Sequence, residues 1–288
     1  MKVLLFGKTG QVAREITALA DGETKITALG RDKADLSDPE SLAPIIAGSG
    51  ADIVINAAAY TAVDRAEEEP DLAETVNHHA PAAMAQAAAE AGLPFLHVST
   101  DYVFDGTGRD PWNTDKPRKP LSVYGATKAR GEKAVQEAGG RSAILRTAWV
   151  FSAHGSNFVK TMLRLGHERD ALSIVSDQIS GPTPASGIAR TLLAMGRAFH
   201  EEPERKSGIW HYTGRPDISW AGFAAEIFAQ AGLDVKITPI PTADYPTPAA
   251  RPHNSRLNCA TLQRDFGIRQ ADWKAALADV LTELGETT

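Results

Sequence analysis

Short apolar runs alternate with longer amphipathic stretches along the first half of the chain. The runs 2–6, 25–29 and 51–56 each end at glycine or alanine residues, and a stretch with helical spacing follows each one. Two further apolar runs, 94–98 and 142–147, extend the pattern. Strands that are buried on both faces are apolar throughout, and strands that alternate with helices pair in parallel. The pattern therefore predicts an α/β protein with a doubly wound parallel sheet, whose ligands bind at the carboxyl ends of the strands.

The alternation loosens after about residue 151. The stretches 158–167, 220–231 and 272–284 have helical spacing, and irregular segments separate them. This change predicts a smaller α/β domain that is interleaved with the first and binds the substrate. The predicted boundaries are residues 1–150 plus about 173–200 for the sheet domain, and about 151–172 plus 201–288 for the smaller domain.

The composition is that of an ordinary globular chain, and it excludes several classes of protein. Of the 288 residues, 43% are hydrophobic and 23% are charged. A formal net charge of −6 without a basic block argues against nucleic acid as a partner. The single cysteine, Cys259, cannot form an intrachain disulfide. No apolar segment approaches the ~20 residues of a membrane span and no cleavable signal sequence is visible, so we expect a cytoplasmic protein without a membrane partner.

A glycine turn follows the first apolar run. Gly7 and Gly10 begin the pattern G-x-x-G-x-x-A, which ends at Ala13 and opens a stretch typical of a helix. Glycines permit a tight turn and a close approach of the backbone, and the amides at a helix N-terminus bind a pyrophosphate. The pattern is weak evidence alone, but its place in a β–α–β unit predicts a dinucleotide site. The residues expected to contact the dinucleotide here are Gly7, Thr9, Gly10, Gln11 and Val12.

The end of the second predicted strand indicates which dinucleotide binds. Arg31 offers a cation for a 2′-phosphate, which favours NADPH, whereas Asp32 could bind the ribose hydroxyls of NADH. We expect NADPH, with NADH as the alternative, and we expect Asp35 and Leu36 to flank the adenine. Small residues after the third strand leave room for a flat cofactor, although they would serve tight helix–sheet packing equally well. These residues are Ala57, Ala58 and Ala59.

Tyr124 and Lys128 stand four residues apart in a stretch that predicts a helix, so they share one face. A free tyrosine keeps its proton up to about pH 10, and a nearby cation or the positive ring of an oxidised nicotinamide lowers that pKa. Ser99 and Thr100 follow the fourth apolar run and place hydroxyl groups at the carboxyl end of a strand. These groups predict the reduction of a carbonyl, with hydride from a nicotinamide and a proton from Tyr124.

An ordered set of segments spans nearly the whole chain: 5–12, 56–64, 99–104, 122–125, 146–150, 177–183 and 251–257. Together they resemble the extended short-chain dehydrogenase/reductase superfamily, whose hallmark is a Rossmann fold with Tyr-x-x-x-Lys. Within it the chain is similar to the dTDP-4-dehydrorhamnose reductase family. The resemblance implies a Rossmann-type domain and a nucleotide-sugar-binding domain. It also implies that a reduced nicotinamide converts the C4 ketone of dTDP-6-deoxy-L-lyxo-4-hexulose to dTDP-L-rhamnose.

The resemblance also implies roles for individual residues. Tyr124 would protonate the nascent alkoxide, Lys128 would hold the nicotinamide ribose, and Thr100 would donate a hydrogen bond to the carbonyl oxygen. Trp149 is either a sugar contact or a core residue, because an indole at a strand's carboxyl end suits both. The further residues expected to contact the nucleotide sugar are Thr61, Val63, Asp101, Tyr102, Arg251 and Arg256, with structural ion pairs as the alternative for the two arginines.

Some members of this family dimerise around a magnesium ion that glutamates hold. Glu15 matches one of these ligands, but Ser186 stands where another is expected. We therefore expect a monomer or a homodimer in which no metal ion is bound.

Two other kinds of function are compatible with these motifs. One is another nucleotide-sugar 4-ketoreductase or an epimerase; a 4,6-dehydratase would need an Asp-Glu pair after the threonine, where this chain has Asp101-Tyr102. The other is a non-catalytic regulatory subunit like the beta subunit of methionine adenosyltransferase. The intact Thr100, Tyr124 and Lys128 favour an enzyme.

Overall fold

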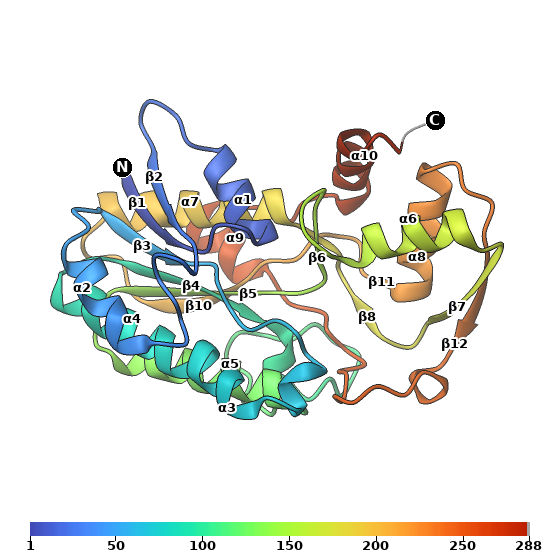
Figure 1. The fold of residues 1–288 in the computed structure, drawn as a ribbon, viewed down its shortest axis with the longest axis horizontal. Helices are drawn as coiled ribbons and strands as arrows, with labels where there is room; N and C mark the ends of the chain where they lie inside the picture. The colour runs from blue at the N-terminus through green and yellow to red at the C-terminus, as the bar shows by residue number, and fades with distance from the viewer. Residues whose placement is uncertain (287–288) are drawn as a thin grey trace.

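Six parallel strands form the central sheet of the computed structural model, which describes residues 1–286 (Figure 1). Their order across the sheet is β10-β5-β4-β3-β1-β2. Parallel neighbours, with a helix between most consecutive strands, confirm the predicted doubly wound sheet. The strands are β1 (Lys2–Phe6), β2 (Lys25–Leu29), β3 (Ile53–Asn56), β4 (Phe95–Thr100), β5 (Ser142–Thr147) and β10 (Gly208–His211).

Helices cover both faces of this sheet (Figure 1). Successive residues of β1 point to opposite sides, so Val3 and Leu5 join one core while Leu4 and Phe6 join the other. The first core lies under α1 (Gln11–Ala18), α7 (Ala185–Glu201) and α9 (Ala260–Phe266). The second core lies under α2 (Leu42–Ala47), α4 (Ala80–Glu90) and α5 (Val123–Glu137).

The strand order changes direction at β1, which pairs with β2 on one side and with β3 on the other. In open parallel sheets this switch point is where ligands bind. Gly7 follows β1 with a φ of +116°, a conformation that favours glycine, and its amide donates to Leu29 O at 2.9 Å. A Cβ on Gly7 would also lie 3.3 Å from the Cβ of Ala13. The turn that the sequence predicts is therefore built at the edge of the sheet that binds ligands.

A further hydrophobic core lies beside the sheet domain, at the right in Figure 1. Aromatic side chains dominate it, with Phe151, Phe223 and Trp273 all fully buried. The helices around it are α6 (Phe158–Glu168), α8 (Trp220–Gln230) and α10 (Trp273–Leu284), and its strand pair is β7 (Ala171–Val175) with β12 (Lys236–Ile240). The short strands are β6 (Val150–Phe151), β8 (Ile179–Ser180), β9 (Thr183–Pro184) and β11 (Ile218–Ser219).

Three elements, β10, α9 and β7, pack in a different domain from the one that the predicted boundaries assign to them. β10 and α9 lie within 201–288, yet β10 pairs with β5 and α9 contributes Leu262 to the core under α7. β7 overlaps the range 173–200, yet it contributes Leu172 and Ile174 to the aromatic core. The pattern of apolar residues could not assign these elements, because membership of a sheet depends on the pairing partner.

Between Pro70 and Glu90 the chain forms three consecutive helical segments. These are α3 (Pro70–Glu74), a π-helical turn (Thr75–His79) and α4. The π-helical turn holds Asn77, whose side chain is fully buried. Its amide accepts from Tyr60 N at 2.9 Å and donates to Tyr60 O at 3.1 Å, so the widened turn fixes the loop after β3.

Two more elements differ from the predictions. β4 extends to Thr100, so Ser99 and Thr100 belong to the strand and do not follow it. The helix α9 was not predicted, because its short sequence has no clear apolar spacing. Four 3₁₀ turns complete the described chain: η1 (Pro39–Ser41), η2 (Arg65–Glu67), η4 (Asp101–Val103) and η5 (Thr242–Asp244). Within residues 1–286, no helix combines the length and the apolar character needed to cross a membrane.

Candidate active site

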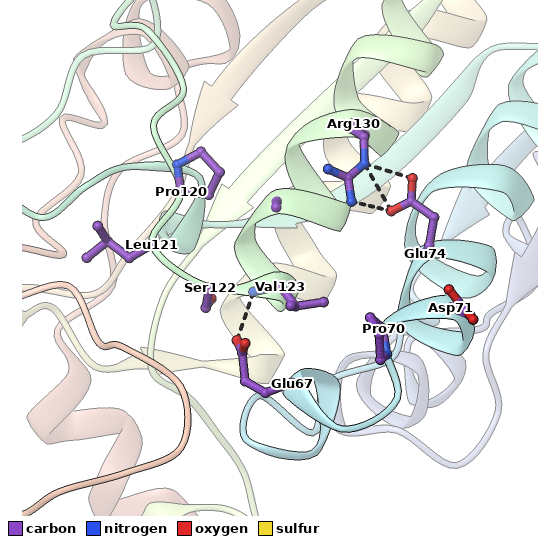
Figure 2. Close-up of a pocket in the computed structure, with 10 residues that line it drawn as sticks. Glu67, Pro70, Asp71, Glu74, Pro120, Leu121, Ser122, Val123 and Arg130 are labelled. Carbon is purple, nitrogen blue, oxygen red and sulfur yellow. Dashed lines mark hydrogen bonds and ion pairs between the residues drawn. The ribbon is translucent and has the colours of Figure 1, made fainter.

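Tyr124 lies in the first turn of α5, and the start of this helix is fixed from two sides. The Ser122 hydroxyl caps the helix by accepting from Gly125 N at 3.2 Å. The Glu67 carboxylate accepts from Val123 N at 2.9 Å, as Figure 2 shows. A surface hollow of about 510 Å³ lies beside this helix start, and none of the predicted site residues lines it. Figure 2 shows the residues that line it. The hollow thus marks the outer side of α5.

A glycine brings α5 close to the end of β4. A Cβ on Gly125 would lie 2.2 Å from Tyr102 O, so a larger residue would push the helix away from η4. The close approach sets the ring of Tyr102 edge-on against that of Tyr124, with 5.4 Å between centroids. Val63 packs against the small core cluster that contains Tyr124. Three predicted site residues therefore lie close together: Tyr102 of η4, Tyr124 of α5 and Val63 of the loop after β3.

The surroundings of Tyr124 keep its phenol protonated. Burial raises the pKa of Tyr124 to about 12, the Thr100 side chain opposes this shift, and the charge of Asp101 adds to it. Lys128 is not among the groups that shift this pKa. The expectation that Lys128 lowers the pKa of Tyr124 stays a prediction for the enzyme with its cofactor bound. The result suits an acid that delivers its proton only when an alkoxide forms.

Thr100 and Asp101 form one hydrogen-bonded unit beside this phenol. The Thr100 hydroxyl donates to Asp101 Oδ1 at 3.0 Å and accepts from Tyr102 N at 3.2 Å. The other oxygen, Asp101 Oδ2, is buried without a hydrogen-bond partner among the described residues. Burial raises the pKa of Asp101 to about 6, although the hydroxyl groups of Ser255 and Thr100 favour the ionised form.

Lys128 is buried one turn further along α5 than Tyr124, with 1% of its surface exposed. Its Nζ donates to Val98 O at 2.8 Å and lies 3.1 Å from His97 Nε2. Burial lowers the pKa of Lys128 to about 8, and the charge of Glu132 opposes this shift. His97 was not predicted as a site residue. A histidine inside an otherwise apolar run was the one signal that could have indicated it.

A buried ion cluster around Glu132 lies next to the site residues of β4 and α5. Glu132, which is fully buried on α5, accepts from Ser99 Oγ at 2.6 Å and from Arg146 at 2.8 and 2.7 Å. Arg118 donates to the same carboxylate at 2.6 Å. Burial would raise the pKa of Glu132, but the contacts with Arg146 and Arg118 lower it overall. The cluster connects β4, β5 and α5, and no pattern in the sequence predicted it.

The residues predicted for the dinucleotide gather at the switch point. Thr9 and Gly10 are exposed at the start of α1, and Ala57 lies against Gly7. The side chain of Gln11 accepts from Ser152 Oγ at 3.0 Å and from Asn157 Nδ2 at 2.9 Å, which holds the segment after β6. The open glycine turn and its exposed backbone fit a dinucleotide. Ala58 and Ala59 are half-buried beyond Ala57, and the Val12 side chain belongs to the core.

The residues predicted around the adenine are at the end of β2. The Arg31 side chain is 73% exposed and lies 3.4 Å from the carboxylate of Asp35. An exposed pair at this distance is weak, so the guanidinium is free to move. Leu36 is buried in the core under α2. The role of these residues in cofactor binding stays a prediction.

Thr61 and Trp149 are two of the residues predicted to contact the nucleotide sugar. Thr61 is exposed on the loop after β3. Trp149 has a φ of +49°, which is unusual outside glycine, and its ring stacks on Trp220 at 3.5 Å between centroids. It is half-buried at the edge of the aromatic core, so it packs there and still presents one part to solvent.

Arg251 and Arg256 were predicted either to contact the nucleotide sugar or to form structural ion pairs. In the structure both form ion pairs. Arg251 donates to both carboxylate oxygens of Asp64 at 2.8 and 2.7 Å. Arg256 lies 3.6 Å from Asp217 and donates to Asn254 Oδ1 at 3.0 Å. The first pair connects the smaller domain to the loop after β3. Contacts of either arginine with a diphosphate stay a prediction.

The residues around Glu15 do not fit a divalent cation. His154 lies 3.9 Å from Glu15 and 3.9 Å from Glu283, and Arg190 donates to Ser186 Oγ at 3.4 Å. Burial raises the pKa of Glu15, while the charges of His154 and Arg190 lower it. The side chains of His154 and Arg190 therefore occupy the surroundings that a metal ion at Glu15 would need.

Comparisons with known proteins agree with this geometry. Residues 1–286 match the family model described as the RmlD substrate binding domain. A dTDP-4-dehydrorhamnose reductase of Burkholderia thailandensis is 44% identical over 295 residues, covering 99% of each chain. A crystal structure of a dTDP-4-dehydrorhamnose reductase from Clostridium acetobutylicum superposes with a TM-score of 0.92 at 36% identity, covering 99% of this chain and 100% of that one. A dTDP-4-dehydrorhamnose reductase from Bacillus anthracis, solved in complex with NADP, superposes with a TM-score of 0.90 at 31% identity, covering 98% and 99%.

Proposed function

Because the chain belongs to the RmlD substrate binding domain family, we propose that it is a dTDP-4-dehydrorhamnose reductase. It is an NAD(P)H-dependent oxidoreductase that reduces the C4 ketone of dTDP-6-deoxy-L-lyxo-4-hexulose to dTDP-L-rhamnose. The observation that carries the proposal is the meeting of a buried, protonated Tyr124 with the hydroxyl of Thr100. A ketone needs a proton donor and a hydrogen-bond donor on its oxygen, and these two residues offer both.

The glycine turn after β1 and the exposed guanidinium of Arg31 fit NADPH. When bound, this cofactor supplies the hydride. Gly7 uses its own amide for Leu29 O, and the exposed turn at Thr9 and Gly10 leaves the start of α1 accessible to the pyrophosphate. Arg31 offers a charge for the 2′-phosphate, with Asp35 as its partner in the free protein.

Residues of the chain supply the proton that the reduced ketone oxygen needs. Tyr124 donates its hydroxyl proton to the oxygen that was the ketone, and the burial that raises its pKa keeps the proton in place until then. Thr100 donates a hydrogen bond to the same oxygen after its hydroxyl turns away from Asp101. Burial of Thr100 and Tyr124, at 6% and 9% exposure, strengthens both interactions by excluding water. Lys128 provides the positive charge that stabilises the phenolate left behind.

The alternatives are weaker for reasons of geometry. A scaffolding subunit has no need of a buried phenol, hydroxyl and lysine that converge from β4 and α5. An epimerase of the same superfamily would use the same three groups but would keep its nicotinamide through the reaction cycle. Release of oxidised cofactor in stoichiometric amounts therefore distinguishes a reductase. A nucleotide-sugar substrate, a monomeric or homodimeric state and a cytoplasmic location complete the proposal.

The experiment is an assay of NADPH oxidation in the presence of dTDP-6-deoxy-L-lyxo-4-hexulose. We expect one NADPH oxidised for each dTDP-L-rhamnose formed. Tyr124→Phe should lower kcat by about 10²–10⁴-fold, the usual contribution of a general acid, and should leave the Kd of NADPH unchanged. Tyr212→Phe, which alters a buried phenol outside the site, is the matched control. Failure of the parent chain to oxidise NADPH with this sugar would contradict the proposal.

A further inference from the structure

Three buried side chains form a hydrogen-bonded series beneath the site. Asn56 ends β3, His97 lies opposite it on β4, and Lys128 reaches them from α5. Asn56 and His97 are 0% exposed and Lys128 is 1% exposed, so all three are buried from bulk solvent. Asn56 Nδ2 lies 3.2 Å from His97 Nδ1, and His97 Nε2 lies 3.1 Å from Lys128 Nζ.

A backbone amide fixes the orientation of the first member. The N–H of Ala58 donates to Asn56 Oδ1 at 3.0 Å. A backbone N–H can only donate, so the oxygen of the Asn56 side chain must face it. The amide nitrogen of Asn56 therefore faces His97, and a primary amide nitrogen also can only donate.

This orientation determines the tautomer of His97. Because Asn56 donates to Nδ1, that nitrogen must carry a lone pair, and the proton of the neutral imidazole is on Nε2. The N–H at Nε2 points at Lys128 Nζ. A neutral amine has a lone pair that accepts this hydrogen bond, and it still has an N–H for Val98 O at 2.8 Å. An ammonium group would instead place two donors against each other.

We propose that His97 is a positioning residue that, in the tautomer imposed by Asn56, turns its Nε2–H toward Lys128 Nζ and so favours the neutral amine of Lys128 over the ammonium. The inference rests on the proposed function, because it concerns the lysine of that same site. Lys128 then keeps its proton only at a pH below its lowered pKa. The charge that stabilises the phenolate of Tyr124 is therefore conditional on pH.

The charges around Lys128 agree with this reading. Burial is the main reason that its pKa is lowered, to about 8, and Glu132 on the same helix is the charged group that opposes the shift. The Glu132 carboxylate is already engaged by Arg146 and Arg118, which weakens its effect. From β4, the pKa of His97 is lowered well below its usual range by burial and by Lys128, so the imidazole stays neutral. β3 contributes only the uncharged amide of Asn56.

The first test is the tautomer itself, and it needs no substrate. Long-range ¹⁵N–¹H spectra of the full ¹⁵N-labelled chain report which ring nitrogen of each histidine is protonated, and the signals that vanish in His97→Phe identify His97. We expect a protonated Nε2, a bare Nδ1 and no change between pH 6 and 9. A protonated Nδ1 would overturn the inference even if the reductase activity is normal, and an inactive chain would leave this result valid.

The second test is the pH profile of kcat/KM. We expect the parent activity to fall above about pH 8, where Lys128 loses its proton. In Asn56→Asp, the carboxylate can accept from both Ala58 N–H and His97 Nδ1–H, which reverses the tautomer and offers Nε2 to the ammonium. The alkaline limb should move up by at least one pH unit, with His97 protonated at Nδ1.

Two further variants keep this second test decisive. His97→Phe removes the opposing donor, so its alkaline limb should also move up by at least one pH unit. Phe95→Leu is the control, because Phe95 stacks on His97 with 6.1 Å between ring centroids, so the change disturbs the same core but removes no hydrogen bond of the series. Its limb should stay in place. An alkaline limb that stays unchanged in His97→Phe would overturn the inference.

Discussion

The hydroxyl group of Thr100 donates its only proton to Asp101 Oδ1, at 3.0 Å. The hydroxyl oxygen accepts from Tyr102 N at 3.2 Å, which fixes its position but not the direction of its O–H bond. Thr100, which is expected to polarise the ketone, thus donates its hydrogen bond to a neighbouring carboxylate in the free protein. Rotation of this O–H bond is enough to transfer the hydrogen bond from Asp101 to the sugar.

The first prediction concerns this hydroxyl. Thr100→Val keeps the shape of the side chain and removes the donor, and it should lower kcat by about 10²–10³-fold, as loss of one oxyanion donor does. Thr100→Ser keeps the hydroxyl and should stay within about tenfold of the parent. Steady-state kinetics with the 4-ketosugar check this. A valine variant with parental kcat would remove Thr100 from the chemistry.

The second prediction concerns the pH dependence of stability. The pKa of Asp101 is about 6 in the folded chain and about 3.9 in an unfolded one. Between pH 4 and 6 the folded state binds more protons, so the free energy of unfolding falls as the pH rises through this window. Asp101→Asn removes the effect. The variant should gain roughly 2 kcal/mol relative to the parent between pH 4 and pH 7.

Urea unfolding of both proteins at several pH values measures this difference. Asp115→Asn, which alters an exposed carboxylate in the loop after η4, is the control and should track the parent throughout. A constant difference between Asp101→Asn and the parent from pH 4 to 7 would show that Asp101 titrates normally.

The third prediction concerns the choice of cofactor. Arg31→Ala removes the exposed guanidinium at the end of β2, and the KM for NADPH should rise about tenfold because a charge-assisted hydrogen bond to the 2′-phosphate is lost. The KM for NADH should change less than twofold. Lys33→Ala removes another exposed cation nearby and should change neither value. Equal effects of Arg31→Ala on both cofactors would rule out a contact with the 2′-phosphate.

The fourth prediction concerns the buried ion cluster. Glu132→Gln leaves Arg146, which is 1% exposed, without its counter-charge, and such a loss destabilises a protein by about 3–5 kcal/mol. Glu137→Gln removes a carboxylate that is 64% exposed and pairs with Lys133 at 3.6 Å, so it should change stability by less than about 1 kcal/mol. Chemical unfolding at neutral pH compares the two. Similar effects would mean that the cluster does not stabilise the fold.

Local pattern was enough to predict much of this protein. The alternation of apolar runs with helical stretches predicted the parallel sheet, because a strand that is buried on both faces is apolar at nearly every residue. The spacing of Tyr124 and Lys128 predicted one helix face, and the glycines at 7 and 10 predicted the turn after β1. In each case the information lies within a few neighbouring residues.

The remaining features depend on contacts between distant segments. Asn56 meets His97 only because β3 and β4 pair in the register that places them opposite each other. Arg251 meets Asp64 across 187 positions, so its alternatives could not be decided from the sequence. The π-helical turn around Asn77 changes the helical spacing by a single residue, which leaves the pattern of apolar positions almost unaltered.

The most direct test is transfer of deuterium to dTDP-6-deoxy-L-lyxo-4-hexulose from NADPH in which both hydrogens at C4 of the nicotinamide are deuterium. The account predicts dTDP-L-rhamnose with one deuterium at C4 of the sugar, formed by the parent chain and at least a hundredfold more slowly by Tyr124→Phe, as expected for loss of a general acid. A sugar recovered without deuterium, or equal rates in the two proteins, would contradict it.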